Sequence, residues 1–140
     1  PCGLGARDSL RLEMCYPLNG SDLSPDKTPL EAGLGFFCAL DTDFMGSDIL
    51  REQKANGLSR RLAAIEYTGK GAPPRAHYAV HVPGAIGELT SGVLSPSLMK
   101  GIALAYLPAA YAKVGTELEI DVRGRKFPAV VVKKPFYKKG

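Results

Sequence analysis

Cysteine, histidine and long apolar runs are all scarce in this 140-residue sequence, and each shortage excludes a class of protein. The three cysteines, Cys2, Cys15 and Cys38, are widely spaced and form no C-x-x-C pair, which excludes a disulfide framework and a cysteine zinc site. Free thiols are typical of a reducing compartment, so we expect an intracellular protein. No apolar run approaches the ~20 residues that a membrane-spanning helix needs, and we expect no membrane partner.

The motifs of common active sites are also missing. Gly3 and Gly5 in "GLGARDS" suggest a nucleotide-binding loop, but a third glycine and a Gly-Lys-Ser/Thr sequence are both absent. His77 and His81 lie four apart with no third ligand for a metal. Ser91 shows no nucleophile-elbow pattern. The sequence therefore predicts no catalytic residue and no metal site of its own.

What the chain does contain is ordinary for a globular protein, with 45% apolar residues, 23% charged residues and a net charge of +4. Much of the positive excess lies in a carboxyl-terminal tail that mixes lysines with aromatic residues: Lys133, Lys134, Phe136, Tyr137, Lys138 and Lys139. Such a tail is either a solvated terminus or a grip for single-stranded nucleic acid. Because no RNA-binding signature accompanies it, we expect no nucleic-acid partner.

The first 57 residues predict short helices. The spacing of apolar residues predicts one helix over Leu4–Cys15, and turn-forming residues then predict a loop. Thr28 and Glu31 form a capping-box pattern that predicts a helix from Pro29 to about Cys38. A further helix is expected over Gly46–Gly57, capped by its first serine or aspartate and ended by the glycine.

After Gly57 the pattern changes to short alternating or β-branched runs separated by turn formers. Two segments, Val82–Gly87 and Val122–Lys126, read as hairpin turns. Five or six such strands with no helix between them predict a small antiparallel barrel or sandwich. The expected fold is mostly β with a short helical lead-in. We therefore divide the chain into a helical segment, residues 1–57, and an all-β domain, residues 58–140.

The charged first helix has two possible interpretations. Arg7, Asp8, Arg11 and Glu13 suit a surface network of charge pairs, each worth a few tenths of a kcal/mol. Alternatively, Arg7 points into a cavity and fixes a carboxylate or carbonyl of a ligand, with Tyr16 lining the same cavity. Composition does not choose between these interpretations.

Four stretches, taken in order, resemble the carboxyl-terminal part of the glycine cleavage system T-protein family. They are "GLGARDSLRLE", "PLNGSDLSPDKTPLEAGLGF", "APPRAHYAVHVPGAIGELTSGVLSPSLMKGIALAYLP" and "GTELEIDVRGRKFPAVVVKKPFY". The resemblance implies the end of a folate-binding region followed by a β-barrel domain. It also implies a tetrahydrofolate-dependent aminomethyltransferase, which takes an aminomethyl group from a lipoyl carrier protein, releases ammonia and forms methylene-tetrahydrofolate.

The resemblance assigns three residues to folate. Arg7 matches a folate-contacting arginine, Tyr16 matches a folate-lining tyrosine, and Lys138 stands after "PFY" where relatives often carry arginine. The family's catalytic aspartate and pterin-binding glutamate would lie upstream of Pro1, so this chain is expected to be an inactive fragment. The wording "MCYPLNG" departs from the more usual "AGYPLYG", with Asn19 in place of a tyrosine. A cytoplasmic location is implied, or a mitochondrial one if the source is eukaryotic.

Two alternatives remain open within the same resemblance. One is a folate-dependent demethylase or oxidase of the sarcosine or dimethylglycine type, which the flavin content of the parent protein would reveal. The other is a non-catalytic folate-binding scaffold protein, which need not keep the catalytic aspartate upstream.

Overall fold

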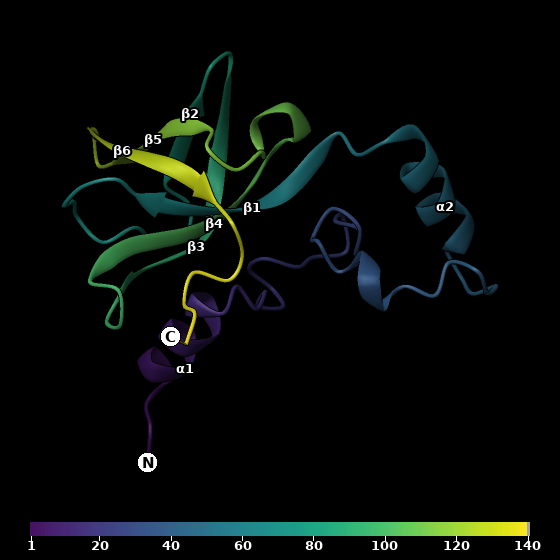
Figure 1. Cartoon of the computed structure of the whole chain (residues 1–140), viewed down its shortest axis with the longest axis horizontal. Helices are drawn as coiled ribbons and strands as arrows, with labels where there is room; N and C mark the ends of the chain where they lie inside the picture. The colour runs from purple at the N-terminus through teal and green to yellow at the C-terminus, as the bar shows by residue number, and fades with distance from the viewer. Residues whose placement is uncertain (140) are drawn as a thin grey trace.

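The computed structural model describes residues 1–139 and shows a helical lead-in followed by a closed barrel of strands (Figure 1). The lead-in contains α1 (Leu4–Glu13), the 3₁₀ turn η1 (Gly35–Phe37) and α2 (Ser47–Asn56). The barrel strands are β1 (Arg60–Tyr67), β2 (Ala79–Val82), β3 (Ala85–Ser95), β4 (Lys100–Pro108), β5 (Glu117–Val122) and β6 (Arg125–Val132), with the 3₁₀ turn η2 (Ala109–Tyr111) after β4. The expected mostly-β fold with a helical lead-in is confirmed.

The six strands close in the order β1-β4-β3-β2-β5-β6, and every neighbouring pair is antiparallel. Both predicted hairpin turns are confirmed. Val82 pairs with Ala85 and Val122 pairs with Arg125, so each hairpin has a loop of two residues. The second loop residue is Gly84 (φ +80°) in one hairpin and Gly124 (φ +84°) in the other. Glycine suits this left-handed backbone, because two-residue hairpin loops commonly need positive φ.

The barrel has apolar packing on its inside and, along one side, on its outside as well. Alternate residues of every strand fill the interior, as the two-residue period of a strand requires. The outward residues Leu62, Ile102 and Leu104 on β1 and β4 pack against Leu12 of α1. Strands buried on both faces need apolar residues in both sets of alternate positions, which explains the runs "LAAI" in β1 and "IALA" in β4.

The predicted helix from Pro29 to Cys38 is wrong, although its capping contacts form. The Thr28 backbone N–H donates to Glu31 Oε2 at 2.9 Å, and the Glu31 N–H donates to Thr28 Oγ1 at 3.3 Å. The chain makes only one turn here, because the Glu31 carbonyl accepts the N–H of Leu62 in β1 at 2.8 Å. In a continuing helix this carbonyl would accept the backbone N–H of the residue four positions later. Gly33, at φ +79°, then turns the chain away. Only the short η1 follows.

The other helix predictions hold with small corrections. α1 ends at Glu13, two residues before the expected boundary. α2 forms, and Gly57 ends it with a positive φ of +88°, as expected. Its N-cap is Gly46 in a left-handed conformation and not the predicted Ser47 or Asp48 side chain. α2 lies away from the barrel (Figure 1). Among the helices that the structure describes, none has the length and apolar character to cross a membrane.

Candidate functional site

α1 and the carboxyl-terminal tail lie together against one side of the barrel; the three residues that the resemblance assigns to folate lie on α1 (Arg7), just after it (Tyr16) and on the tail (Lys138). After β6 the chain returns to the end of α1, where the Tyr137 N–H donates to the Glu13 carbonyl at 3.0 Å (Figure 1). Leu12, 0% exposed, anchors the helix in the apolar layer outside β1 and β4. This packing fixes the position of the charged side chains on α1.

A polar junction around Asp22 ties α1 and the following loop to β3. The Asp22 side chain is 0% exposed and accepts hydrogen bonds from Arg11 Nη1 (2.7 Å), the Leu18 N–H (2.8 Å), Ser91 Oγ (2.9 Å) and Thr90 Oγ1 (2.5 Å). Arg11 also donates to Ser91 Oγ at 2.9 Å. A buried carboxylate persists only when it is paired and hydrogen-bonded in this way. The Asp22 junction therefore fixes α1 and the following loop on β3.

Glu13 makes a second buried attachment, to the turn that joins β3 and β4. Its carboxylate, in a residue that is 4% exposed, accepts hydrogen bonds from Ser95 Oγ (2.5 Å), Ser97 Oγ (2.9 Å) and the Ser97 N–H (3.2 Å). Burial acts to raise the pKa of Glu13, but these hydrogen bonds outweigh it and hold that pKa below its ordinary value of 4.5. The ionised carboxylate is thus the form that the fold prefers.

This lowered pKa predicts an acid-sensitive attachment. A carboxyl whose pKa is lower in the folded chain stabilises the fold at neutral pH, and that contribution disappears as the pH falls below about 4.5. We expect Glu13→Gln to lower the free energy of unfolding at about pH 7, and the difference from the unmodified chain to shrink toward about pH 3. Urea unfolding at a series of pH values measures both. Glu52→Gln, on the exposed face of α2, is the control and should leave the pH profile unchanged. A constant difference between Glu13→Gln and the unmodified chain at every pH would contradict the prediction.

The side chains of Arg7, Tyr16 and Lys138 are each exposed to solvent. Arg7 is exposed on α1, and Lys138 is exposed on the tail that is bonded to the end of α1. Within residues 1–139 neither of these two cations forms an ion pair. The Tyr16 backbone N–H bonds to the Arg11 carbonyl at 2.9 Å, and its side chain is 62% exposed. Their role in binding stays a prediction.

A hollow of about 450 Å³ runs along α1, but the three predicted residues do not line it. Its walls are Gly5, Ala6, Ser9, Leu10, Glu13, Pro96 and Ser97. Arg7 and Tyr16 are instead exposed on α1 and just after it, outside this hollow. An open face can contribute cations and an aromatic ring to a site, but it does not by itself enclose a ligand.

Sequence reasoning missed the structural roles of Arg11, Glu13 and Asp22. It placed the first two in a surface charge network, and only the Asp8–Arg11 pair, at 2.5 Å, fits that description. One sequence feature could have indicated the burial of Glu13, because it directly follows Leu12 on the apolar side of the helix. The hydroxyl-rich stretches "TSG" and "SPS" on and after β3 offered possible partners. The pairing itself depends on the tertiary fold.

Comparison with known proteins decides the family. Residues 1–42 match the model of the GCVT N-terminal domain, and residues 60–138 match that of the glycine cleavage T-protein C-terminal barrel domain. The second match alone covers more than half of the chain. The chain belongs to the glycine cleavage T-protein family.

Individual relatives are similar to this chain along nearly its whole length. The chain is 52% identical to the aminomethyltransferase of Picosynechococcus sp. over 141 residues and 51% identical to that of Bacillus mycoides over 142 residues. Each match covers 99% of this chain and 39% or 38% of the relative, so the chain spans less than two fifths of their length. The crystal structure of the glycine cleavage system aminomethyltransferase T from Bartonella henselae superposes with a TM-score of 0.87 at 34% identity, over 96% of this chain and 39% of that one.

These matches confirm the resemblance drawn from the sequence motifs, which pointed to the carboxyl-terminal part of a T-protein. α1 and Asp22 lie in the portion that matches the N-terminal domain model, whereas the barrel, with Thr90 and Ser91 of the Asp22 junction, and the tail through Lys138 lie in the portion that matches the barrel model. The predicted folate-binding residues thus come from both portions, joined where the tail meets α1. The division at residue 57 stays a prediction.

Proposed function

We propose that this chain forms part of an aminomethyltransferase of the glycine cleavage system. The reaction transfers an aminomethyl group from a lipoyl carrier protein to tetrahydrofolate, releases ammonia and forms methylene-tetrahydrofolate. The observation that carries the proposal is the roughly 50% identity to proteins named aminomethyltransferase along 99% of the chain. The lipoyl carrier protein and tetrahydrofolate are the expected partners, and a reducing compartment suits the buried free thiol of Cys15. That compartment is the cytoplasm, or the mitochondrion if the source is eukaryotic.

In this proposal the exposed face of α1 and the tail supply one wall of the folate site. Tetrahydrofolate carries flat rings and carboxylates. The guanidinium of Arg7 and the ammonium of Lys138 have no acidic partner among residues 1–139, and Tyr16 offers an exposed ring. Cations without partners suit the carboxylates of the ligand, and the tyrosine ring suits its flat part. No residue of this chain is assigned a catalytic role.

The contribution of such a wall is orientation and electrostatic complementarity. The Asp22 junction and the Glu13 attachment hold α1 rigidly on the barrel, so Arg7 is presented without further ordering of the helix. The groups that handle protons at the reacting nitrogen would come from the portion of the T-protein fold that this chain does not contain.

Arg7→Ala, made in a complete T-protein that carries this chain, tests the proposal. A charge-assisted hydrogen bond contributes about 1.5–3 kcal/mol, so we expect tetrahydrofolate affinity to fall by roughly one to two orders of magnitude, with a matching loss of kcat/KM. Equilibrium binding and steady-state kinetics measure the effect. The thermal unfolding transition should not move, because the exposed Arg7 side chain makes no hydrogen bond or ion pair within residues 1–139.

The matched control is Lys54→Ala, which removes an exposed cation from α2, away from the barrel (Figure 1), that forms no ion pair within residues 1–139. It should leave tetrahydrofolate affinity unchanged. Unchanged affinity and turnover in Arg7→Ala would remove the proposed role of this residue. Failure of the complete, unmodified protein to catalyse aminomethyl transfer would overturn the proposed function itself.

A further inference from the structure

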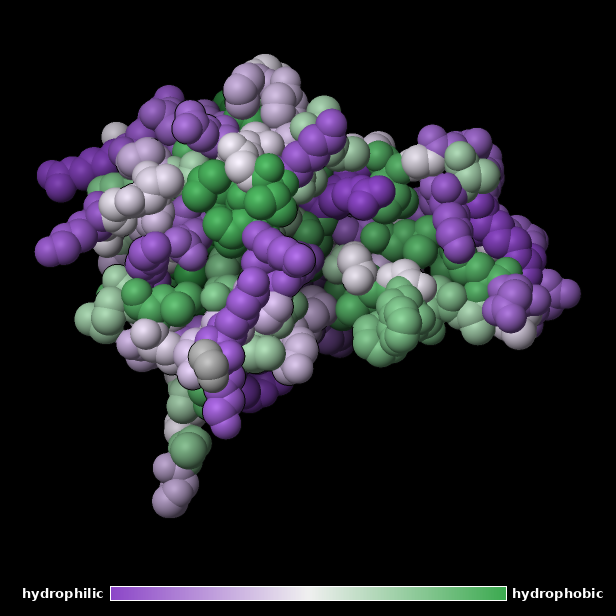
Figure 2. Space-filling model, viewed as in Figure 1, coloured by the Kyte–Doolittle hydropathy of each residue, from purple (hydrophilic) through white to green (hydrophobic). Residues whose placement is uncertain are grey.

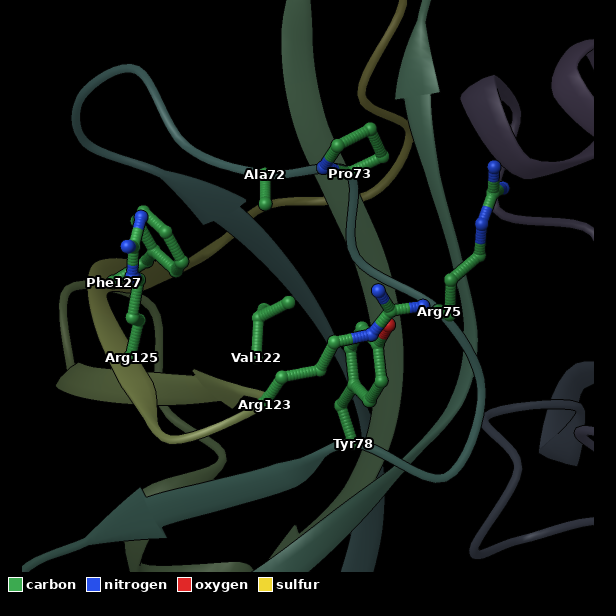
Figure 3. A pocket seen from close by; sticks show the side chains of 8 residues that line it. All are labelled: Ala72, Pro73, Arg75, Tyr78, Val122, Arg123, Arg125 and Phe127. Atoms are coloured by element: carbon green, nitrogen blue, oxygen red, sulfur yellow. The ribbon is translucent and has the colours of Figure 1, made fainter.

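A second pocket lies at the end of the barrel, between the loop that precedes β2 and the β5–β6 hairpin (Figure 3). Its volume is about 420 Å³, within the range of small-molecule sites. The lining residues come only from these two segments: Ala72, Pro73, Arg75, Tyr78, Val122, Arg123, Arg125 and Phe127. None of them belongs to α1 or to the tail, so this pocket is separate from the proposed folate-binding wall.

The pocket has an apolar centre with an arginine and an aromatic ring on each side. In Figure 3, Val122 lies between Arg125 and Phe127 on one side and Arg123 and Tyr78 on the other. Arg125 and Phe127 are alternate residues of β6 and therefore share a face of that strand. The guanidinium of Arg123 extends toward Tyr78, whereas Arg75 turns away from the other two arginines. Arg123 and Arg125 are thus the cations of the pocket.

These two arginines have no counter-charge of their own. Within residues 1–139 neither one forms an ion pair or a side-chain hydrogen bond. The two acids of this hairpin nearest its loop have other partners: Asp121 accepts the Gly124 N–H at 2.7 Å, and Glu119 pairs with Lys126 at 3.2 Å. Long hydrophilic side chains project from this side of the molecule (Figure 2). Two guanidinium groups without an ion-pair partner, within three residues of each other, make this end of the barrel attractive to anions.

Arg123 also occupies a position that its side chain does not favour. It is the first residue of the two-residue hairpin loop and has φ +54°, where asparagine, aspartate or glycine is usual. An unfavourable backbone conformation kept by a residue with no structural partner is typical of a functional position. The hairpin would form more easily with a smaller residue, so the fold alone does not account for the arginine.

The walls of the pocket are held by close packing. A Cβ on Gly71 would lie 2.8 Å from Phe127 Cδ1, so the loop rests directly on that ring. A Cβ on Gly92 would lie 2.8 Å from the backbone of Pro74, which fixes the same loop on β3. The Phe127 ring is further supported by Tyr67, with ring centroids 5.7 Å apart. The pocket is therefore largely pre-formed, as ligand sites usually are.

We infer that this barrel-end pocket binds a small organic anion with a flat ring, a phosphate or carboxylate facing Arg123 and Arg125. Guanidinium groups match both anions through paired N–H donors. Tyr78, Phe127 and Val122 supply the apolar surface on which a flat ring rests. The inference does not depend on the proposed function, because it uses none of the residues assigned to folate.

The inference is tested by measuring how AMP, benzoate and inorganic phosphate bind to the chain, with calorimetry or NMR titration. We expect saturable binding of AMP or benzoate, with the tighter of the two showing whether phosphate or carboxylate is preferred. Inorganic phosphate should bind at least about tenfold more weakly, because it lacks the ring. Arg123→Gly and Arg125→Ala should each weaken binding about tenfold or more.

Two further comparisons separate a binding role of the arginines from a structural one. Arg123→Gly places glycine at a positive φ, so it should raise the unfolding temperature while it weakens binding, a pair of effects that a purely structural arginine would not show. Lys126→Ala is the matched control, because Lys126 lies on the same strand between the two pocket residues Arg125 and Phe127, on the opposite face, and pairs with Glu119. The inference is overturned if neither AMP nor benzoate binds saturably, or if the arginine variants bind as tightly as the unmodified chain. It is also overturned if Lys126→Ala loses as much affinity as they do, or if inorganic phosphate binds as tightly as AMP and benzoate.

Discussion

Replacing Asp22 with alanine is expected to lower the free energy of unfolding by about 3–5 kcal/mol, the largest effect of any single polar substitution we propose. Asp22 is completely buried and pairs with Arg11 at 2.7 Å. Its removal leaves the Arg11 guanidinium, whose side chain is only 13% exposed, with the half-exposed Asp8 as its one remaining acidic partner among residues 1–139. It also removes the acceptor of the hydrogen bonds from Leu18, Ser91 and Thr90. Loss of the buried partner from a largely buried ion pair costs far more than loss of a surface ion pair.

Urea or thermal unfolding measures this effect, and Asp43→Ala provides the matched control. Asp43 also pairs with an arginine, Arg51, at 2.9 Å, but its side chain is 95% exposed. Such a pair is worth at most about 1 kcal/mol, so the control should stay close to the unmodified chain. Comparable losses in the two variants would mean that burial of the Asp22 junction does not matter. In the complete T-protein we also expect Asp22→Ala to impair tetrahydrofolate binding indirectly, through loosening of α1.

Gly101→Ala is expected to destabilise the chain by about 2–3 kcal/mol or more, because the added methyl group has no space. A Cβ at this position would lie 2.3 Å from Cδ2 of Tyr67 on the neighbouring strand β1. The Tyr67 ring is 2% exposed and packed against Phe127, so it cannot move aside without disturbing the barrel interior. Dense interiors transmit such overlaps as strain.

Gly69→Ala is the control for Gly101→Ala. No heavy atom lies within 4 Å of a Cβ at Gly69, and its φ is not positive, so the substitution should change stability by less than about 0.5 kcal/mol. A double variant, Gly101→Ala with Tyr67→Leu, adds a specific test. If overlap with the ring causes the loss, the double variant should be more stable than the sum of the two single effects predicts. Simple additivity would rule out this cause.

The β-barrel could be predicted from the sequence because its signals are local. Alternating residues, β-branched runs and the turns at Pro83–Gly84 and Arg123–Gly124 each fix a short stretch of chain, and neighbouring hairpins then follow. The lead-in was harder, because tertiary contacts override its local preferences. The capping contacts of Thr28 and Glu31 form as predicted, yet β1 takes the Glu31 carbonyl and the helix ends after one turn.

The candidate site shows the same limit. The resemblance pointed to Arg7, Tyr16 and Lys138, and the structure places them on α1, just after α1 and on the tail bonded to it. The residues that hold this arrangement were not recognised. Asp22 was treated as part of a turn-rich loop, and its partners Thr90 and Ser91 lie almost seventy residues away. No pattern within a sequence window connects groups so far apart; only the fold does.

The strand order has a consequence for how this chain comes to be folded. β1 is the first strand of the barrel to be made, but its second neighbour, β6, is the last of the six. Until then a nascent barrel has two open edges, β1 and β5, with free N–H and C=O groups that invite pairing with other chains. The loss of β6 would therefore leave an aggregation-prone open sheet and not a smaller barrel. Non-local closure of this kind also folds slowly, so the strand that arrives last sets how long these edges stay exposed.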